Sequence, residues 1–209
     1  MCKQTKPFGG MDMTISLKKG DRIRLSKEVQ GLAEVLVGLG WDPVKKTGFL
    51  SRFIGQPAEI DIDASVLMVN ERGHLEDTSD LVYFKNLKSP CRSVIHQGDN
   101  LTGEGDGDDE SIEVDLTRIP SRIHKLVFVV NIYDCIRRSQ SFDMVQNAYI
   151  RLMDRRSGRE IIKYDLNENY TGKTALIVGE LERINGEWEF TAIGKPTNDT
   201  DLSQICRRY

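Results

Sequence analysis

The sequence lacks any apolar stretch long enough to cross a membrane. Its longest apolar run lies near residues 126–130, whereas a spanning helix needs about 20 residues. No apolar segment follows the first lysines, so the pattern of a secretory signal peptide is also missing. We therefore expect a cytoplasmic protein without a transmembrane segment.

Cysteine and histidine are scarce and scattered. None of the four cysteines or three histidines falls in a CxxC pair or in a spacing that binds zinc. This pattern favours free thiols in a reducing compartment. The cysteines are Cys2, Cys91, Cys135 and Cys206. Cys135 comes just after the β-type run of residues 126–133, which predicts an inert residue of the core.

A strong net charge is also missing. The formal charge of -3 gives no general attraction to nucleic acid or to anionic membranes. The chain is 39% hydrophobic and 29% charged, which is typical of a folded domain with a sizeable core. A length of 209 residues suits one all-β domain. We expect a flexible extension over residues 1–12 and a single domain over residues 13–209.

Short β-type runs fill most of the chain. They alternate or are rich in β-branched residues, and Gly, Pro, Asn or Asp separates them. The expected strands are residues 13–17, 20–25, 32–39, 60–70, 80–84, 112–116, 126–133, 148–153, 161–164, 175–181 and 188–193. Helical turns are expected only at residues 143–147 and 201–208, and tight turns at residues 185–186 and 155–158. The pattern predicts an all-β sandwich or barrel.

One segment of this chain is strongly acidic. Residues 98–110 read GDNLTGEGDGDDE and contain no lysine or arginine. Without its six carboxylates the rest of the chain would be net positive, so the acidity is a local feature. The six are Asp99, Glu104, Asp106, Asp108, Asp109 and Glu110.

The composition of this segment matches the needs of calcium. Calcium takes six to eight oxygens at about 2.3–2.6 Å from carboxylates, amides and backbone carbonyls. Gly98, Gly103, Gly105 and Gly107 let the chain turn tightly and point its carbonyls inward. Closely spaced carboxylates repel one another by on the order of 1 kcal/mol a pair near a surface, and a divalent cation removes that cost. The segment therefore predicts a calcium-binding loop.

Other interpretations fit the segment less well. An EF-hand from Asp99 to Glu110 would place Leu101, Gly103 and Glu104 where acid, acid and glycine belong. A phosphate-binding loop needs a lysine and a helix start, and a calcium β-roll needs tandem copies. A solvated acidic turn is the plain alternative. The interleaved glycines and a second acidic pair favour calcium over it.

The second acidic pair is Asp61 and Asp63, in the sequence DIDAS. Residues i and i+2 of a strand share a face, so the two carboxylates would lie side by side. Such a pair is unfavourable unless a positive charge lies between them. Alone, the pattern more often marks an exposed strand face. Together with the acidic loop, it could supply the remaining oxygens of one site.

These motifs resemble the TerD family of tellurium-resistance and general stress proteins. The acidic loop and DIDAS carry most of the resemblance. Further matches are KGDRIRL from residue 19, VYFKNL from 82, FVVNIYD from 128, QSF from 140, AYIRL from 148 and GEWEF from 186. The similarity extends over residues 14–209, which is nearly the whole chain.

The resemblance implies a β-sandwich of two mostly antiparallel sheets with a few short helices, which binds two calcium ions. It implies a cytoplasmic role in the response to tellurite and other stresses. It also implies that backbone carbonyls of Gly103 and Gly105 and the side chains of Asn86 and Asn100 join the carboxylates. The full implied ligand set is Asp61, Asp63, Asn86, Asp99, Asn100, Gly103, Glu104, Gly105, Asp106, Asp108, Asp109 and Glu110.

Three functions compete on these grounds. The first is a non-enzymatic, calcium-rigidified interaction module that contacts other stress-response proteins or a membrane-associated complex, and no nucleic acid. The second is a metal-dependent phosphate-ester hydrolase, although His74, His96 and His124 fall in no ligand spacing and no nucleophile–base pair stands out. The third is thiol-based handling of tellurite or redox stress through Cys91 and Cys135.

Overall fold

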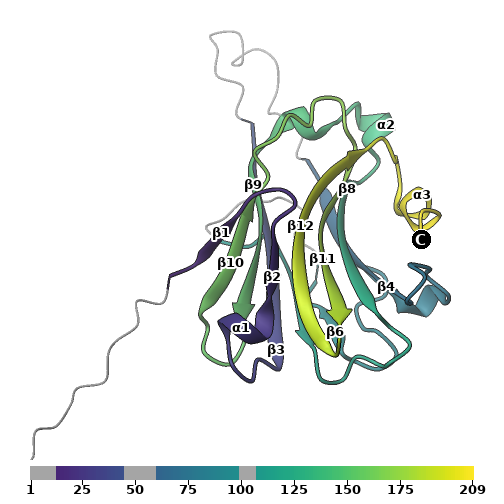
Figure 1. Cartoon of the computed structure of the whole chain (residues 1–209). Coiled ribbons are helices and arrows are strands. Elements are labelled where there is room, and N and C mark those ends of the chain that lie inside the picture. The colour runs from purple at the N-terminus through teal and green to yellow at the C-terminus, as the bar shows by residue number, and fades with distance from the viewer. Residues whose placement is uncertain (1–12, 45–59, 99–106) are drawn as a thin grey trace, which may run out of the picture.

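Two six-stranded sheets lie face to face in the computed structural model, which describes residues 13–44, 60–98 and 107–209 (Figure 1). The first sheet has the order β1 (Ile15–Leu17), β10 (Glu160–Asp165), β9 (Val145–Asp154), β3 (Glu34–Pro43), β7 (Glu110–Asp115) and β6 (Val94–His96). The second has the order β2 (Arg22–Arg24), β12 (Glu187–Thr197), β11 (Ala175–Ile184), β8 (Lys125–Ile132), β4 (Ile62–Val69) and β5 (Leu81–Val82). Every neighbouring pair is antiparallel except β1 and β10. The expected β-sandwich is confirmed.

Both tight turns form where the sequence predicts them. Asn185 and Gly186 have φ values of 51° and 83°, and they join β11 to β12 with Ile184 opposite Glu187. Asparagine and glycine suit this turn because both tolerate positive φ. A turn over residues 155–158 joins β9 to β10, and Gly158 takes a φ of 72° there.

The helices are short, as expected, but the helical segments at residues 25–28, 78–80 and 135–138 were not predicted. They are α1 (Leu25–Glu28), α2 (Cys135–Arg138), α3 (Leu202–Cys206) and the 3-10 turns η2 (Thr78–Asp80) and η3 (Phe142–Met144). The turn expected at 201–208 is confirmed by α3. The one expected at 143–147 is wrong beyond Met144, because Val145 pairs with Pro43 of β3 and begins strand β9. Strand β6 was not predicted, because Val94-Ile95-His96 shows no apolar–polar alternation.

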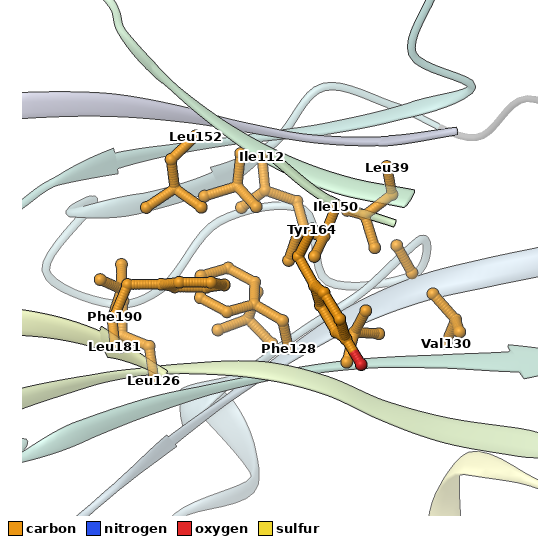
Figure 2. Packing of buried hydrophobic residues seen from close by; sticks show 14 of the residues in the cluster. Leu39, Ile112, Leu126, Phe128, Val130, Ile150, Leu152, Tyr164, Leu181 and Phe190 are labelled. Carbon is orange, nitrogen blue, oxygen red and sulfur yellow. The ribbon is translucent and has the colours of Figure 1, made fainter. Parts of the chain in front are cut away.

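Alternating side chains of the two sheets fill the space between them (Figure 2). Leu39, Ile112 and Ile150 come from the first sheet, and Phe128 and Phe190 face them from the second. All five are almost fully buried. This apolar core accounts for the alternation seen in the sequence of most strands.

A second, smaller apolar cluster covers the outer side of the second sheet. Leu67, Val69, Val127 and Val129 point outward there and pack against Ile205 of α3. Helix α3 lies beside this sheet near the C-terminus (Figure 1). Both faces of β4 and β8 are therefore buried, which explains why their sequences read as continuous apolar runs.

Candidate functional site

The acidic segment ends where strand β7 begins. Six of the implied ligands, Asp99, Asn100, Gly103, Glu104, Gly105 and Asp106, lie outside the described residues. The structure places the other six, which are Asp61, Asp63, Asn86, Asp108, Asp109 and Glu110. They fall into distinct environments set by the pleat of the strands.

Asp108 lies on the outer face of the first sheet. Its carboxylate accepts two hydrogen bonds from Arg151 of β9, from Nε at 2.7 Å and from Nη2 at 3.0 Å. The Tyr149 hydroxyl also donates to it at 3.0 Å. The carboxylate sits directly over Gly38, where any Cβ would overlap it. Glycine in the middle of β3 thus makes room for a bidentate ion pair.

Asp109 faces a different neighbourhood, at the end of β3. Its Oδ2 accepts a hydrogen bond from the Trp41 backbone amide at 2.7 Å, and its own amide donates to Leu39 at 2.8 Å. Burial raises the pKa of this carboxyl, and the nearby charges of Asp42 and Asp108 raise it further. Like charges therefore crowd this end of the first sheet. Asp42 was missed in the sequence, because only the pairing of β3 with β7 brings it near Asp109.

Glu110 points into the space between the sheets and meets His96. Both side chains are about 2% exposed, and His96 Nε2 lies 2.9 Å from Glu110 Oε2. The same nitrogen lies 3.2 Å from the Ala64 carbonyl oxygen of β4. Because Nδ1 accepts a hydrogen bond from the Gly98 amide, the ring proton belongs on Nε2, which faces the Ala64 carbonyl oxygen and lies close to the Glu110 carboxylate.

This histidine brings the two acidic motifs together. Ala64 directly follows Asp63, and Glu110 directly follows Asp109. One imidazole thus bridges the DIDAS strand and the end of the acidic segment, although they belong to opposite sheets. A histidine that falls in no ligand spacing gives no sequence signal for such a bridge.

Asp61 and Asp63 share the outer side of the second sheet. Asp61 Oδ2 lies 3.6 Å from Arg138 Nη1, and Asp63 sits opposite Asn131 of β8. Asp63 is buried with Asn131, whereas Ile62 and Ala64 point into the core. The expected common face is confirmed by this alternation.

Asn86 has a structural role in the loop after β5. Its amide nitrogen donates to the backbone oxygens of Leu81, at 2.6 Å, and Ser79, at 3.2 Å. These bonds hold the turn that carries Tyr83 and Phe84. Within residues 13–44, 60–98 and 107–209, no group of three or more His, Cys, Asp or Glu side chains is placed to hold a metal ion.

The cysteines of the described residues differ in environment. Cys135 is buried, as expected, and burial raises the pKa of its thiol. Cys91 is half-buried. Burial raises the pKa of that thiol, but hydrogen bonds with Ser89 and Ser93 outweigh this and lower it overall.

A model of the TerD domain matches residues 13–209, which is nearly the whole chain. The chain belongs to the TerD family. Stress response protein SCP2 of Bacillus subtilis is 54% identical over 199 residues, covering 94% of this chain and 100% of its own length. Tellurium resistance protein TerD of Serratia marcescens is 42% identical, covering 94% of this chain and 97% of its own length.

A solved TerD-like structure has the same fold. The homologue of telluride resistance protein from Streptomyces coelicolor superimposes with a TM-score of 0.63 at 23% identity, over 84% of this chain and 96% of that one. This TerD-family chain is thus similar in sequence to stress-response and tellurium-resistance proteins and similar in fold to a solved relative. In the part of the chain that the structure describes, no helix has the length and apolarity to cross a membrane.

Proposed function

We propose that this TerD-family protein is a non-enzymatic, calcium-binding module of a cytoplasmic stress response. The observation that carries the proposal is the crowding of Asp42, Asp108 and Asp109 at the end of the first sheet. Burial, and then the charges of Asp42 and Asp108, raise the pKa of Asp109, so its charged form carries a free-energy penalty there. A divalent cation beside it would remove that penalty.

The donors of the chain suit calcium. Carboxylates and amide oxygens are the ligands that this hard cation prefers. We propose that Asp109 and the acids of the preceding segment, Asp99, Glu104 and Asp106, bind together with Asp61 and Asp63 of the DIDAS strand. The His96 bridge supports this arrangement because it holds the two backbones close to each other.

Asp108 and Glu110 have a supporting role in this proposal. Asp108 is occupied by Arg151 and Tyr149, and Glu110 contacts His96. Their contacts fix the chain where β7 begins and so would orient the acidic segment before it. The two relatives are named for stress response and tellurium resistance, which supports a role in stress protection.

A partner protein would recognise the surface that calcium orders. Binding of calcium to the folded state alone adds about 2.7 kcal/mol of stability at a hundredfold excess over Kd. Much of that free energy would go into fixing the acidic segment against the DIDAS strand. The ordered segment would then contact another stress-response protein, including one bound to a membrane complex.

Calcium titration of chelator-stripped protein tests the proposal. We expect calorimetry to report two bound ions. We also expect calcium to raise Tm by about 5–10 °C, because 1 kcal/mol shifts Tm by about 2–4 °C in a domain of this size. Asp61→Asn combined with Asp63→Asn should remove most of the shift. Asp165→Asn, which changes an exposed surface pair, is the matched control and should leave the shift intact.

Two outcomes would reject the proposal. One is a Tm that calcium leaves unchanged in stripped protein. The other is a calcium response that the Asp61 and Asp63 substitutions do not reduce. A phosphate-ester hydrolysis assay on the same samples checks the non-enzymatic part, since turnover lost in Asp63→Asn would show an enzyme.

A further inference from the structure

An open cleft lies on the outer side of the second sheet, away from the sandwich core. It has a volume of about 570 Å³, which falls in the range of small-molecule sites. Strands β4 and β8 form its floor, and the loop after β5 and the start of α3 form its walls. The lining residues are Asp63, Tyr83, Phe84, Asn131, Tyr133, Asp134, Thr200, Asp201, Leu202 and Ser203.

Asn131 on the floor of this cleft carries an unsatisfied polar atom. The residue is 4% exposed, and its carboxamide oxygen has no hydrogen-bond partner within the described part of the chain. A buried acceptor without a donor costs on the order of 1–3 kcal/mol. A ligand that brings an N–H group to this oxygen would recover that cost.

The charge of the lining selects the kind of ligand. Three of the ten lining residues are aspartates, and none is Lys, Arg or His. Asp134 is paired with Arg137, and the Asp201 carboxylate accepts from the Gln204 amide at the start of α3. Arg137 largely compensates the charge of Asp134, so Asp201 contributes the negative charge beside the cleft, while Asn131 offers the direct contact.

Aromatic rings complete the lining. Tyr83, Phe84 and Tyr133 form a chain of edge-to-face contacts with ring centroids 5.4 and 6.5 Å apart. Tyr133 is 46% exposed despite its size. The faces of such rings attract cations. Lys85 and Arg138 already lie over Phe84 and Tyr133, at 5.2 and 5.5 Å from the ring centroids, so a ligand would use the ring surface of Tyr133 that stays exposed.

We propose that this cleft binds a small organic cation through an ammonium or guanidinium group that donates to Asn131 and packs against Tyr133. A bare metal ion fits the cleft poorly, because aromatic rings supply no oxygen ligands and the cleft is far larger than one ion. The assignment does not depend on calcium binding by the acidic segment. Asp63 lies at the boundary between the two sites, so the test below leaves it unchanged.

The test titrates agmatine into nitrogen-15-labelled protein in the presence of EDTA, followed by NMR. Agmatine carries both cationic groups, and 1,4-butanediol serves as a neutral probe with the same four-carbon spacer. We expect agmatine to shift the amide signals of Asn131, Tyr133 and Leu202 in a saturable way. We expect butanediol to leave them in place.

Substitutions separate binding from folding. Asn131→Leu should weaken agmatine binding at least tenfold, whereas Asn131→Asp should tighten it because it adds a negative charge. Tyr133→Ala, at an exposed ring, should weaken binding several-fold without loss of the folded spectrum. Asn167→Leu changes an exposed asparagine outside the cleft and is the matched control.

Three results would overturn the assignment. They are equal shifts with agmatine and butanediol, unchanged affinity in Asn131→Leu and Tyr133→Ala, or weaker binding in Asn131→Asp than in the native protein. The EDTA keeps these results separate from the calcium titration, so either proposal can fail while the other stands.

Discussion

At the scale of single residues, Asp109 is held in an unfavourable state. Its carboxylate is half-buried, and the charges of Asp42 and Asp108 act on it in addition to burial. The raised pKa means that the folded state binds the proton more tightly than the unfolded chain does. The charged carboxylate therefore lowers stability at neutral pH, and this penalty disappears as the pH falls through the raised pKa.

Asp109→Asn should remove the penalty and keep the hydrogen bond from Trp41, because an amide oxygen can still accept it. In EDTA at pH 7 we expect Tm to rise by about 2 °C, the shift that corresponds to about 1 kcal/mol or less in a domain of this size. In calcium the same variant should lose part of the calcium-induced gain. Differential scanning calorimetry with and without calcium measures both effects.

The pH dependence provides the control for this substitution. The advantage of Asp109→Asn in EDTA should be complete above the raised pKa and absent below the ordinary value of 3.8, where both states are protonated. Asp42→Asn, which removes one of the repelling charges, should give a smaller gain of the same sign. A lower Tm for Asp109→Asn at pH 7 would contradict the electrostatic account.

At the scale of elements, helix α3 is a five-residue segment that cannot be stable alone. Ile205 packs against the outer side of the second sheet, and the Tyr209 carbonyl accepts from the Leu75 amide. Arg208 makes two hydrogen bonds to the Asp199 carboxylate, from Nε at 2.7 Å and from Nη2 at 2.9 Å. This ion pair links a residue just after α3 to the loop that precedes the helix.

The Asp199 pair should make the docking of α3 sensitive to acid. The hydrogen bonds from Arg208 hold the pKa of Asp199 below its ordinary value of 3.8. The stability that the pair contributes is therefore complete above that value and is lost as the pH falls through the lowered pKa. Asp199→Asn should mimic the acid state at pH 7 and speed amide exchange in α3 by about fivefold, as the loss of about 1 kcal/mol implies.

Hydrogen exchange followed by mass spectrometry measures the exchange rate of each peptide separately. The peptide that covers residues 199–209 should exchange faster in Asp199→Asn, while peptides from β7 and β9 stay unchanged. Asp165→Asn breaks an exposed pair with Lys163 and serves as the control. Uniformly faster exchange along the whole chain would show a global loss of stability instead of local release of α3.

At the scale of the whole molecule, the two sheets are joined by the apolar core and by a buried polar bridge. Most of the interface is a contiguous cluster in which Phe128 and Phe190 are the largest fully buried side chains. The bridge is His96, which contacts Glu110 in the first sheet and Ala64 in the second. It lies at the end of the sandwich where the proposed calcium site would form, so it couples that site to global stability.

Removal of the bridge should therefore affect the entire fold. His96→Leu would leave the Glu110 carboxylate buried without the imidazole, and we expect the free energy of unfolding to drop by about 3 kcal/mol in EDTA. Adding Glu110→Met should restore most of that loss, because it removes the buried charge. Urea denaturation of both variants measures the effect, and equal stability of the single and double variants would contradict the proposed pairing.

The outline of the fold was readable from the sequence. Most strands carry their own alternating or apolar pattern, and Asn185-Gly186 and residues 155–158 specify their turns through positive φ. Strand β6 and the start of β9 were not predicted. Val94-Ile95-His96 shows no apolar–polar alternation, and Val145 is a strand residue only through its pairing with Pro43. Local propensity decides long segments, and tertiary pairing decides short ones.

The candidate ligands could also be predicted from the sequence, but the different environments of their side chains could not. Acidic residues in a glycine-rich segment point to a cation by composition alone, which needs no knowledge of the fold. The pleat of the strand decides which carboxylates can reach a cation. Asp108 contacts Arg151 on the outer face, Asp109 lies near other carboxylates at the end of β3, and Glu110 contacts His96 between the sheets. The sequence by itself determined that this end of the protein is acidic. Strand pairing, a non-local interaction, decided that His96 joins the acidic segment to the DIDAS strand. Strand pairing also decided that the carboxamide oxygen of Asn131 lies without a hydrogen-bond donor in the cleft on the second sheet.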